Sequence, residues 1–199
     1  QVLRNLDDAG QLDMYVEACW IAGREDGTLE EFLHRGDNYN MRTCKAFEDG
    51  TLEQKNIALI EPYADDGSNC EPFMNMETMY GYMKHGLDCD CNLHIHAIGD
   101  RSQLEALQVY KRIEGIKPHL TRTIAHNQVN SPQGMDLWES MKENAFFNTT
   151  PCWASEDAIT RLFLGDFRTD NQQFLAKQVI DRGVRVTFGE AFPANHIAL

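Results

Sequence analysis

Apolar and polar positions along this chain form blocks that predict strands and helices in alternation. Short apolar runs bounded by turn residues are typical of strands, and apolar residues spaced three or four apart are typical of helices. The predicted strands are 12–20, 41–47, 92–97, 121–126, 145–150 and 184–189. The predicted helices are 29–34, 75–85, 102–114 and 132–143, followed by a long polar and helical stretch over 155–183.

This alternation predicts an α/β fold, because parallel β/α units place a helix after each strand. The chain has 199 residues, of which 42% are apolar, and this is enough to bury one core. No repeat, low-complexity tract or linker divides the sequence. We therefore expect residues 1–199 to form a single domain.

The charge and the cysteines narrow the class of protein. The formal net charge of −13 argues against nucleic-acid binding, because no basic stripe is present to neutralise phosphates. We find no run of 18 apolar residues and no signal-peptide pattern, so we expect a cytoplasmic protein without a membrane span. The six cysteines are irregularly spaced, which is typical of reduced thiols rather than of a disulfide framework.

Two apolar strands end in histidine. The predicted strand 92–97 closes on His96, and strand 121–126 closes on His126. Parallel strands present their carboxyl ends at one rim of a barrel, so we expect the two rings to converge there. Paired imidazoles favour a divalent metal site. The alternative is that either histidine is a hydrogen-bonded core residue.

Five segments occur in an order and rough spacing that match a known family. They are Lys45-Ala-Phe-Glu-Asp-Gly50, Glu61-Pro-Tyr-Ala-Asp65, His96-Ala-Ile-Gly-Asp-Arg101, Ile124-Ala-His-Asn-Gln128 and Phe188-Gly-Glu-Ala-Phe-Pro193. With these residues the chain resembles amidohydrolase family 3, the YtcJ-like branch of the metal-dependent amidohydrolase superfamily. The resemblance covers nearly the whole chain. It implies a (β/α)8 barrel that hydrolyses amide-type bonds with a bound divalent metal.

The resemblance also implies that the chain is a partial TIM barrel, from about the third strand to the eighth. A complete barrel usually takes about 250 residues. We therefore expect the first strands with their paired histidines, the small β-sandwich and the closing helix of the family to be absent. Open strand edges invite pairing, so we predict self-association or pairing with missing segments of the same protein.

The resemblance implies the metal ligands. His96 and His126 would bind the metal, for which we expect zinc, on the fifth and sixth strands. Lys45 would end the fourth strand, where a carboxylated lysine can bridge two ions. The alternative for Lys45 is a solvent-reaching side chain with a packed stem. The expected substrate is a small amide-type molecule, such as an N-acyl or formamide compound.

The last predicted strand departs from the family pattern. The family places a metal-binding aspartate, which is also the general base, where this chain has Ala191. Glu190 lies one residue earlier, and a one-residue step turns a side chain to the opposite face of a strand. Glu190 is therefore the catalytic candidate only if a bulge redirects it, and otherwise catalysis is lost.

Three more residues are candidates for a substrate pocket. Trp153 either lines the pocket or caps the core. Arg101 either binds a substrate carboxylate or forms a structural ion pair, and Asp49 either contributes to the pocket or forms a tight turn. We expect His94, two residues before His96, to lie deeper in the barrel.

Three functions remain open. The first is a metal-dependent hydrolase of non-peptide carbon–nitrogen bonds, or an incomplete fragment of one. The second is a degenerate, non-catalytic barrel that binds a ligand or a partner. The third is a structural protein stabilised by zinc on Cys70, Cys89 and Cys91. The remaining histidines are expected at the surface; they are His34, His85, His119 and His196.

Overall fold

The computed structural model describes residues 1–24, 27–154 and 158–189. The strands within these ranges are β1 (Val16–Ile21), β2 (His34–Arg35), β3 (Tyr39–Phe47), β4 (Asn92–Ala97), β5 (Arg122–His126), β6 (Phe146–Thr149) and β7 (Arg185–Phe188). The helices are α1 (Val2–Asp8), α2 (Leu29–Phe32), α3 (Met76–Asp88), α4 (Asp100–Arg112), α5 (Pro132–Ser140), α6 (Ala158–Asn171) and α7 (Ala176–Asp181), with a short 3-10 turn, η1 (Pro151–Trp153).

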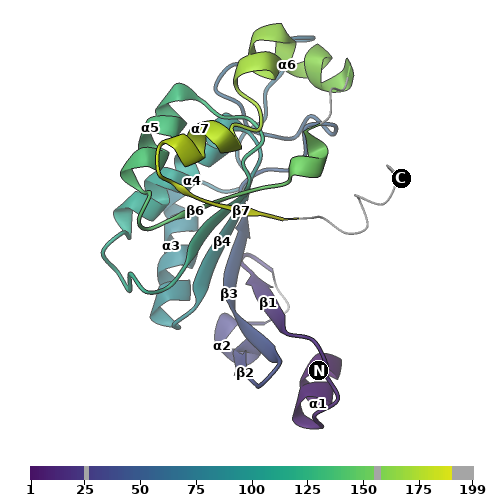
Figure 1. The fold of residues 1–199 in the computed structure, drawn as a ribbon, viewed down its shortest axis with the longest axis vertical. Helices are drawn as coiled ribbons and strands as arrows, with labels where there is room; N and C mark the ends of the chain where they lie inside the picture. The colour runs from purple at the N-terminus through teal and green to yellow at the C-terminus, as the bar shows by residue number, and fades with distance from the viewer. Residues whose placement is uncertain (25–26, 155–157, 190–199) are drawn as a thin grey trace.

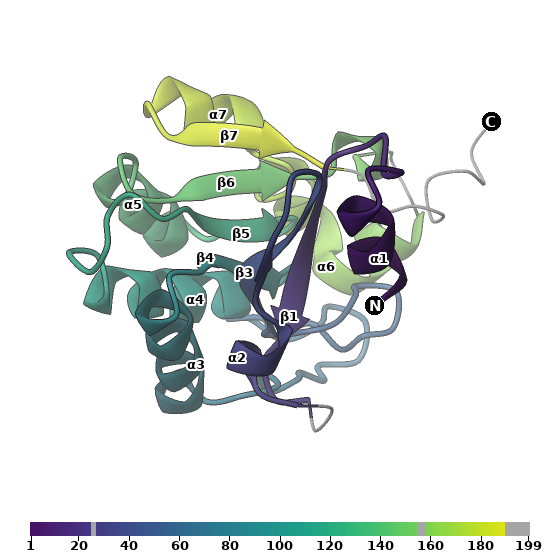
Figure 2. The ribbon, with the colours of Figure 1, turned by 90° about the horizontal axis from the view of Figure 1, so that it is seen from below.

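The strands form a single sheet with a simple order. β1, β3, β4, β5, β6 and β7 follow one another across the sheet in chain order, and each pairs in parallel with the next. The short β2 pairs antiparallel with β3. Figures 1 and 2 show α3, α4 and α5 along one face of this sheet, with α7 beside β7. Parallel strands in chain order, joined by helices on one face, are consecutive units of a (β/α)8 barrel, so the predicted partial barrel is confirmed.

The predicted elements are present with shifted ends. The first strand begins at Val16 rather than at residue 12. Leu12 is buried, but it lies in the loop that precedes the strand. Helix α4 begins at Asp100, two residues before the predicted start. The pattern missed α1 and β2, and His34 lies in β2 rather than at a helix end. Among the described residues, no helix combines the length and the apolar content needed to cross a membrane.

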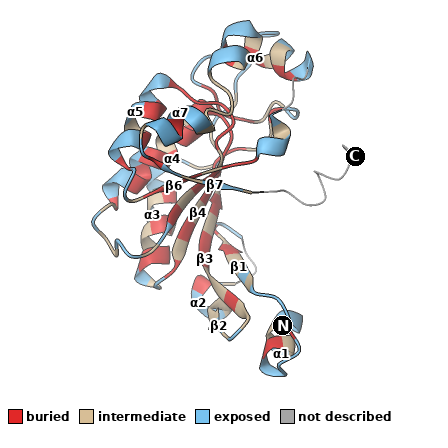
Figure 3. Cartoon of the chain, viewed as in Figure 1, coloured by how far each residue is buried: buried red, intermediate tan, exposed pale blue. Residues whose placement is uncertain are grey.

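The core lies between the sheet and its helices. Cys44, Ala46, Leu93 and Ile95 are almost fully buried in one cluster with side chains of α3, α4 and α5. Figure 3 shows this burial where the sheet meets those helices. Successive residues of a strand point to opposite faces, so the residues between these core positions point to the barrel interior. That interior face carries the candidate site.

Candidate metal centre at the barrel mouth

The predicted histidine pair lies at the carboxyl ends of β4 and β5. The ring centroids of His96 and His126 are 4.5 Å apart, at an interplanar angle of 62°. His96 is 7% exposed and His126 is half-buried. The structure thus brings together the two rings for which the strand pattern predicted a shared rim. Their role as metal ligands stays a prediction.

An irregular backbone conformation directs the His126 ring into the barrel. In the sheet, His96 pairs with Ala125, whereas His126 pairs with Ala97. Ala97 is buried in the cluster on the helix side, and paired residues of neighbouring strands point to the same face. A regular strand would therefore turn His126 towards the helices. Its φ of 75° breaks the alternation, a conformation that is uncommon for residues other than glycine.

Asn127 holds this turn in place. It is fully buried, and its own φ is 45°, which asparagine adopts more readily than most residues. Its side-chain amide donates hydrogen bonds to the carbonyl oxygens of Ile124 and Asn148, at 2.6 and 2.8 Å. Its Oδ1 accepts a hydrogen bond from Gln103 at 2.8 Å. These contacts with β5, β6 and α4 maintain the turn that sets the direction of the His126 ring.

The contacts of His96 define its tautomer. Its Nε2 lies 2.8 Å from the carbonyl oxygen of Gly50 and 3.6 Å from Oδ1 of Asp49. Burial lowers the pKa of His96 to about 4, although the hydrogen bond to Gly50 acts in the opposite direction. The ring is therefore neutral at pH 7, and because a carbonyl only accepts, Nε2 carries the proton. Nδ1 keeps a lone pair, as in metal-binding histidines whose second nitrogen donates to a carbonyl.

His126 is also neutral. Burial lowers its pKa to about 3, and His96 and Lys45 add to the shift. Its Nδ1 lies 3.4 Å from Oγ1 of Thr150, which leaves Nε2 as the candidate ligand atom. Two neutral imidazoles, each with one nitrogen already in contact with an oxygen, fit the requirements of a divalent metal site. Sequence reasoning missed Thr150, although its place at the end of a predicted strand is a usable signal.

Trp153 belongs to this mouth. Its ring stacks on His126, with the centroids 5.0 Å apart and the planes within 4°. It also packs against a smaller apolar cluster that includes Leu52 and Tyr63. A cavity of ≈ 460 Å³ is lined by Pro151 and Cys152, which directly precede Trp153 in the sequence, and by Phe188 and Gly189. The contacts of Trp153 with His126 and with the apolar cluster keep both predicted roles open.

Lys45 lies among the histidines. It is paired in the sheet with His94, and its Nζ lies 4.6 Å from the ring centroid of Phe47. Its charge is one of the causes that lower the pKa values of His94, His96 and His126. Burial lowers the pKa of Lys45 itself, which increases the share of neutral amine. Carboxylation of a lysine requires that neutral form.

His94 occupies the expected position one step deeper on the interior face of β4. Burial is the main reason that its pKa falls to about 4. Its Nε2 is buried, and within the described part of the chain it has no hydrogen-bond partner. His94 is therefore a neutral imidazole that adds to the polar lining below His96.

Asp49 is fully buried next to His96 and stabilises the backbone around the site. Its carboxylate accepts hydrogen bonds from the backbone N–H groups of Ile98 and Gly99, at 2.9 and 2.8 Å. Burial raises the pKa of Asp49 to about 6, whereas these bonds favour its charged form. An added Cβ at Gly99 would lie 2.0 Å from the carbonyl oxygen of Ala58, so only glycine fits there. Asp49 thus ties the end of β3 to the turn after β4 and positions His96.

Arg101 forms the structural ion pairs that were one of its two expected roles. It contacts Glu71 at 2.7 Å and Glu105 at 3.0 Å. Its predicted place in a substrate pocket stays a prediction. Glu190 and Ala191, on which the general base depends, lie outside the described residues.

The predicted cysteine zinc site is not formed as expected. In the described ranges, the one group of three close metal-type ligands is Glu30, His85 and Cys89. Cys91 is buried, and its thiol donates to the carbonyl oxygen of Cys89 at 3.6 Å. That site was one of three alternatives, and it rested on proximity in the sequence, whereas the observed group is assembled between two helices.

The sequence of this chain is similar to that of a known protein. No family model matches the sequence. The chain is 33% identical over 196 residues to the Exoenzymes regulatory protein AepA of Pectobacterium carotovorum subsp. carotovorum. The matched region covers 93% of this chain and 42% of that protein.

Two solved structures share this fold. An uncharacterized metal-dependent hydrolase from Pyrococcus furiosus has a TM-score of 0.83 and 22% identity, over 96% of this chain and 40% of that one. An uncharacterized metal-dependent hydrolase from Pyrococcus horikoshii has a TM-score of 0.83 and 20% identity, over 96% of this chain and 38% of that one. The chain therefore spans less than half the length of each of these three proteins.

Proposed function

We propose that residues 1–199 are part of one barrel domain of a metal-dependent hydrolase that cleaves non-peptide carbon–nitrogen bonds of small molecules. The observation that carries the proposal is the pair of neutral imidazoles, His96 and His126, at one rim of the sheet. The likeness of the fold to proteins described as metal-dependent hydrolases supports it. The resemblance to amidohydrolase family 3 supports the amide-type substrate.

In this proposal His96 and His126 hold a divalent ion through nitrogen lone pairs, and carboxylated Lys45 adds oxygen ligands. Imidazole and carboxylate-type oxygens suit zinc. A bound zinc ion supplies polarisation of a substrate carbonyl and lowers the pKa of water. Asp49 and the Gly50 carbonyl keep the His96 ring in place, and Trp153 offers aromatic surface to the substrate. Glu190 is the proposed acidic group that moves the proton.

Hydrolysis of a panel of N-acyl amino acids and formamides by the zinc-loaded protein tests this function. Turnover that depends on zinc, falls at least about 100-fold in His126→Ala and is unchanged in His119→Ala supports a hydrolase. His119 is an exposed histidine and serves as the matched control. Equal turnover in the two variants would contradict the assignment of His126.

The alternative is a non-catalytic barrel that binds a ligand or a partner. One observation favours it, since the Pectobacterium relative is named a regulatory protein. The same panel separates the two functions. An N-acyl compound that raises the melting temperature of the zinc-loaded protein without being hydrolysed would support the binding function and contradict the hydrolase.

A further inference from the structure

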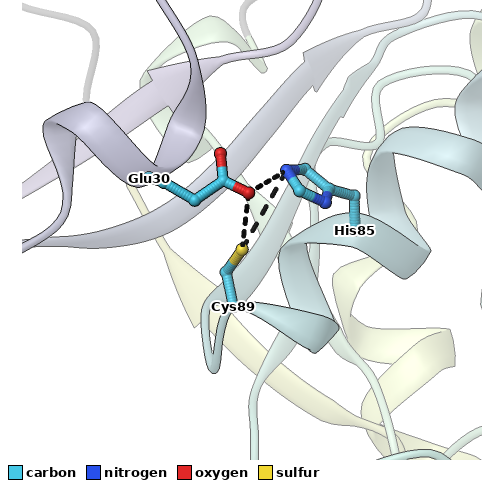
Figure 4. A group of neighbouring side chains, drawn as sticks. All are labelled: Glu30, His85 and Cys89. Carbon is cyan, nitrogen blue, oxygen red and sulfur yellow. Dashed lines mark hydrogen bonds and ion pairs between the residues drawn. The ribbon is translucent and has the colours of Figure 1, made fainter.

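A second group of metal-type ligands lies far from the mouth. Glu30 belongs to α2, His85 to the last turn of α3, and Cys89 is the C-cap residue of α3. Figure 4 shows their side chains pointing toward one another. Because α3 ends just before β4 begins, whereas His96 lies near the end of β4, this group lies at the opposite end of the barrel.

The distances between the ligand atoms suit one tetrahedral zinc ion. Nε2 of His85 lies 3.1 Å from Oε1 of Glu30, and Sγ of Cys89 lies 3.6 Å from the same oxygen. Sγ of Cys89 and Nε2 of His85 are 4.0 Å apart. Zinc bonds of about 2.0 to 2.3 Å at tetrahedral angles separate ligand atoms by about 3.3 to 3.8 Å. Small side-chain movements therefore suffice to form the site.

The types of ligand also select zinc. A thiolate and an imidazole are softer ligands than the oxygens that magnesium and calcium prefer. His85 and Cys89 are four residues apart on α3, so they share one helix face. Glu30 precedes Cys89 by 59 residues and joins them from α2. Such a site links two segments that are distant in the sequence.

The group is accessible to an ion. The side chains of His85 and Glu30 are 43% and 53% exposed. Both also line a cavity of ≈ 600 Å³, together with Trp20, Thr28 and Tyr82 among others. There is thus room for water to complete a fourth position, as in zinc sites with three protein ligands.

We propose that Glu30, His85 and Cys89 bind one zinc ion that cross-links α2 to the end of α3. Without the ion, the Cys89 thiol donates a hydrogen bond to Glu30. On binding, Cys89 releases that proton to solvent and its thiolate sulfur bonds to zinc, while Nε2 of His85 and a Glu30 oxygen each supply a lone pair. The ion binds the folded chain and not the separated segments, so it stabilises the fold. This inference is independent of the hydrolase proposal.

Titration of the metal-free protein with cobalt(II), a spectroscopic substitute for zinc, tests the site. A thiolate ligand gives cobalt a strong charge-transfer absorption in the near ultraviolet, whereas His96, His126 and Lys45 offer no sulfur. We expect the absorption in the wild-type protein and in the His96→Ala/His126→Ala variant. It should be absent in Cys89→Ser and retained in Cys70→Ser, which removes another half-buried thiol.

Thermal unfolding provides a second readout. Zinc should raise the melting temperature of His96→Ala/His126→Ala by several degrees, and a chelator should reverse the rise. In that background, Cys89→Ser and His85→Ala should remove the rise while leaving the melting temperature of the metal-free protein nearly unchanged. Glu30→Gln, which keeps the shape of the side chain, should weaken zinc binding at least about 10-fold. A thiolate absorption that persists in Cys89→Ser, or a zinc-induced rise that persists there, would overturn the inference.

Discussion

His96 and His126 do not pair with each other across β4 and β5, yet their rings lie 4.5 Å apart. The left-handed conformation of His126 accounts for this contact, because it turns the ring out of the regular alternation of β5. Such conformations cost free energy and persist where the surroundings hold them. The ring pair at the mouth therefore depends on the turn that follows β5.

Asn127→Ala should damage both stability and metal binding. The change removes the hydrogen bonds to Ile124 and Asn148. It also replaces asparagine at a positive φ with alanine, which adopts this conformation less readily. We expect a loss of about 2 to 4 kcal/mol in the free energy of unfolding. Zinc affinity at the mouth should fall as well. Denaturant unfolding and a zinc titration measure the two effects, and Asn171→Ala, at an exposed position of α6, is the control.

Asp49→Asn should weaken the mouth site without removing a predicted ligand. The NH2 group of the new amide would face one of the backbone N–H donors of Ile98 and Gly99, so one of these hydrogen bonds is lost. The position of the His96 ring is then less well fixed. We expect zinc affinity to fall about 10- to 100-fold and stability by about 2 kcal/mol. An unchanged zinc dissociation constant in a folded variant would show that Asp49 does not position His96.

Glu48 should make stability depend on pH. It is fully buried, both of its side-chain oxygens lack partners among the described residues, and burial raises its pKa from 4.5 to about 9. Between these values the folded chain keeps a proton that the unfolded chain releases. The contribution of this proton to stability is thus complete below pH 4.5 and is lost as pH rises towards 9.

Glu48→Gln should remove this dependence. The difference in unfolding free energy between the variant and the wild-type protein should increase with pH, by about 1.4 kcal/mol for each pH unit within the window. Parallel stability curves for Glu48→Gln and the wild-type protein would contradict a raised pKa.

Self-association should occur through the ends of the sheet. β1 and β7 lie at the two ends of the strand order, so each has one edge without a strand partner in the described part of the chain. Phe188 on β7 is 64% exposed. Light scattering should show an average mass that rises with concentration, and Phe188→Lys should reduce it, since charge on an edge strand hinders pairing. A mass that stays monomeric at high concentration would contradict the prediction.

The sequence predicted the parts of the fold that depend on local pattern. The apolar run before His96 predicted β4 with its bounds, and the alternation of strands and helices predicted the parallel sheet. The two-residue β2 is too short to show a period, and α1 exposes two of its three apolar residues, Val2 and Leu3, so neither element gave a signal.

The sequence predicted which residues belong to the candidate site, but it did not predict how their side chains are directed. The strand ends indicated His96 and His126, but the strand period directs His126 to the wrong face. Only the fold shows the left-handed turn that corrects this. Similarly, spacing grouped Cys89 with Cys91, whereas the packing of α2 beside α3 places it with Glu30 and His85.

The metal content of the Cys89→Ser protein tests the central claim most directly, because that background removes the second candidate site. After loading with zinc and removal of free ions, this protein should retain about one ion per chain. Adding His96→Ala and His126→Ala should reduce the content to background, and adding His119→Ala should not. Zinc that remains bound after loss of both His96 and His126 would contradict the assignment of the barrel mouth as a metal centre.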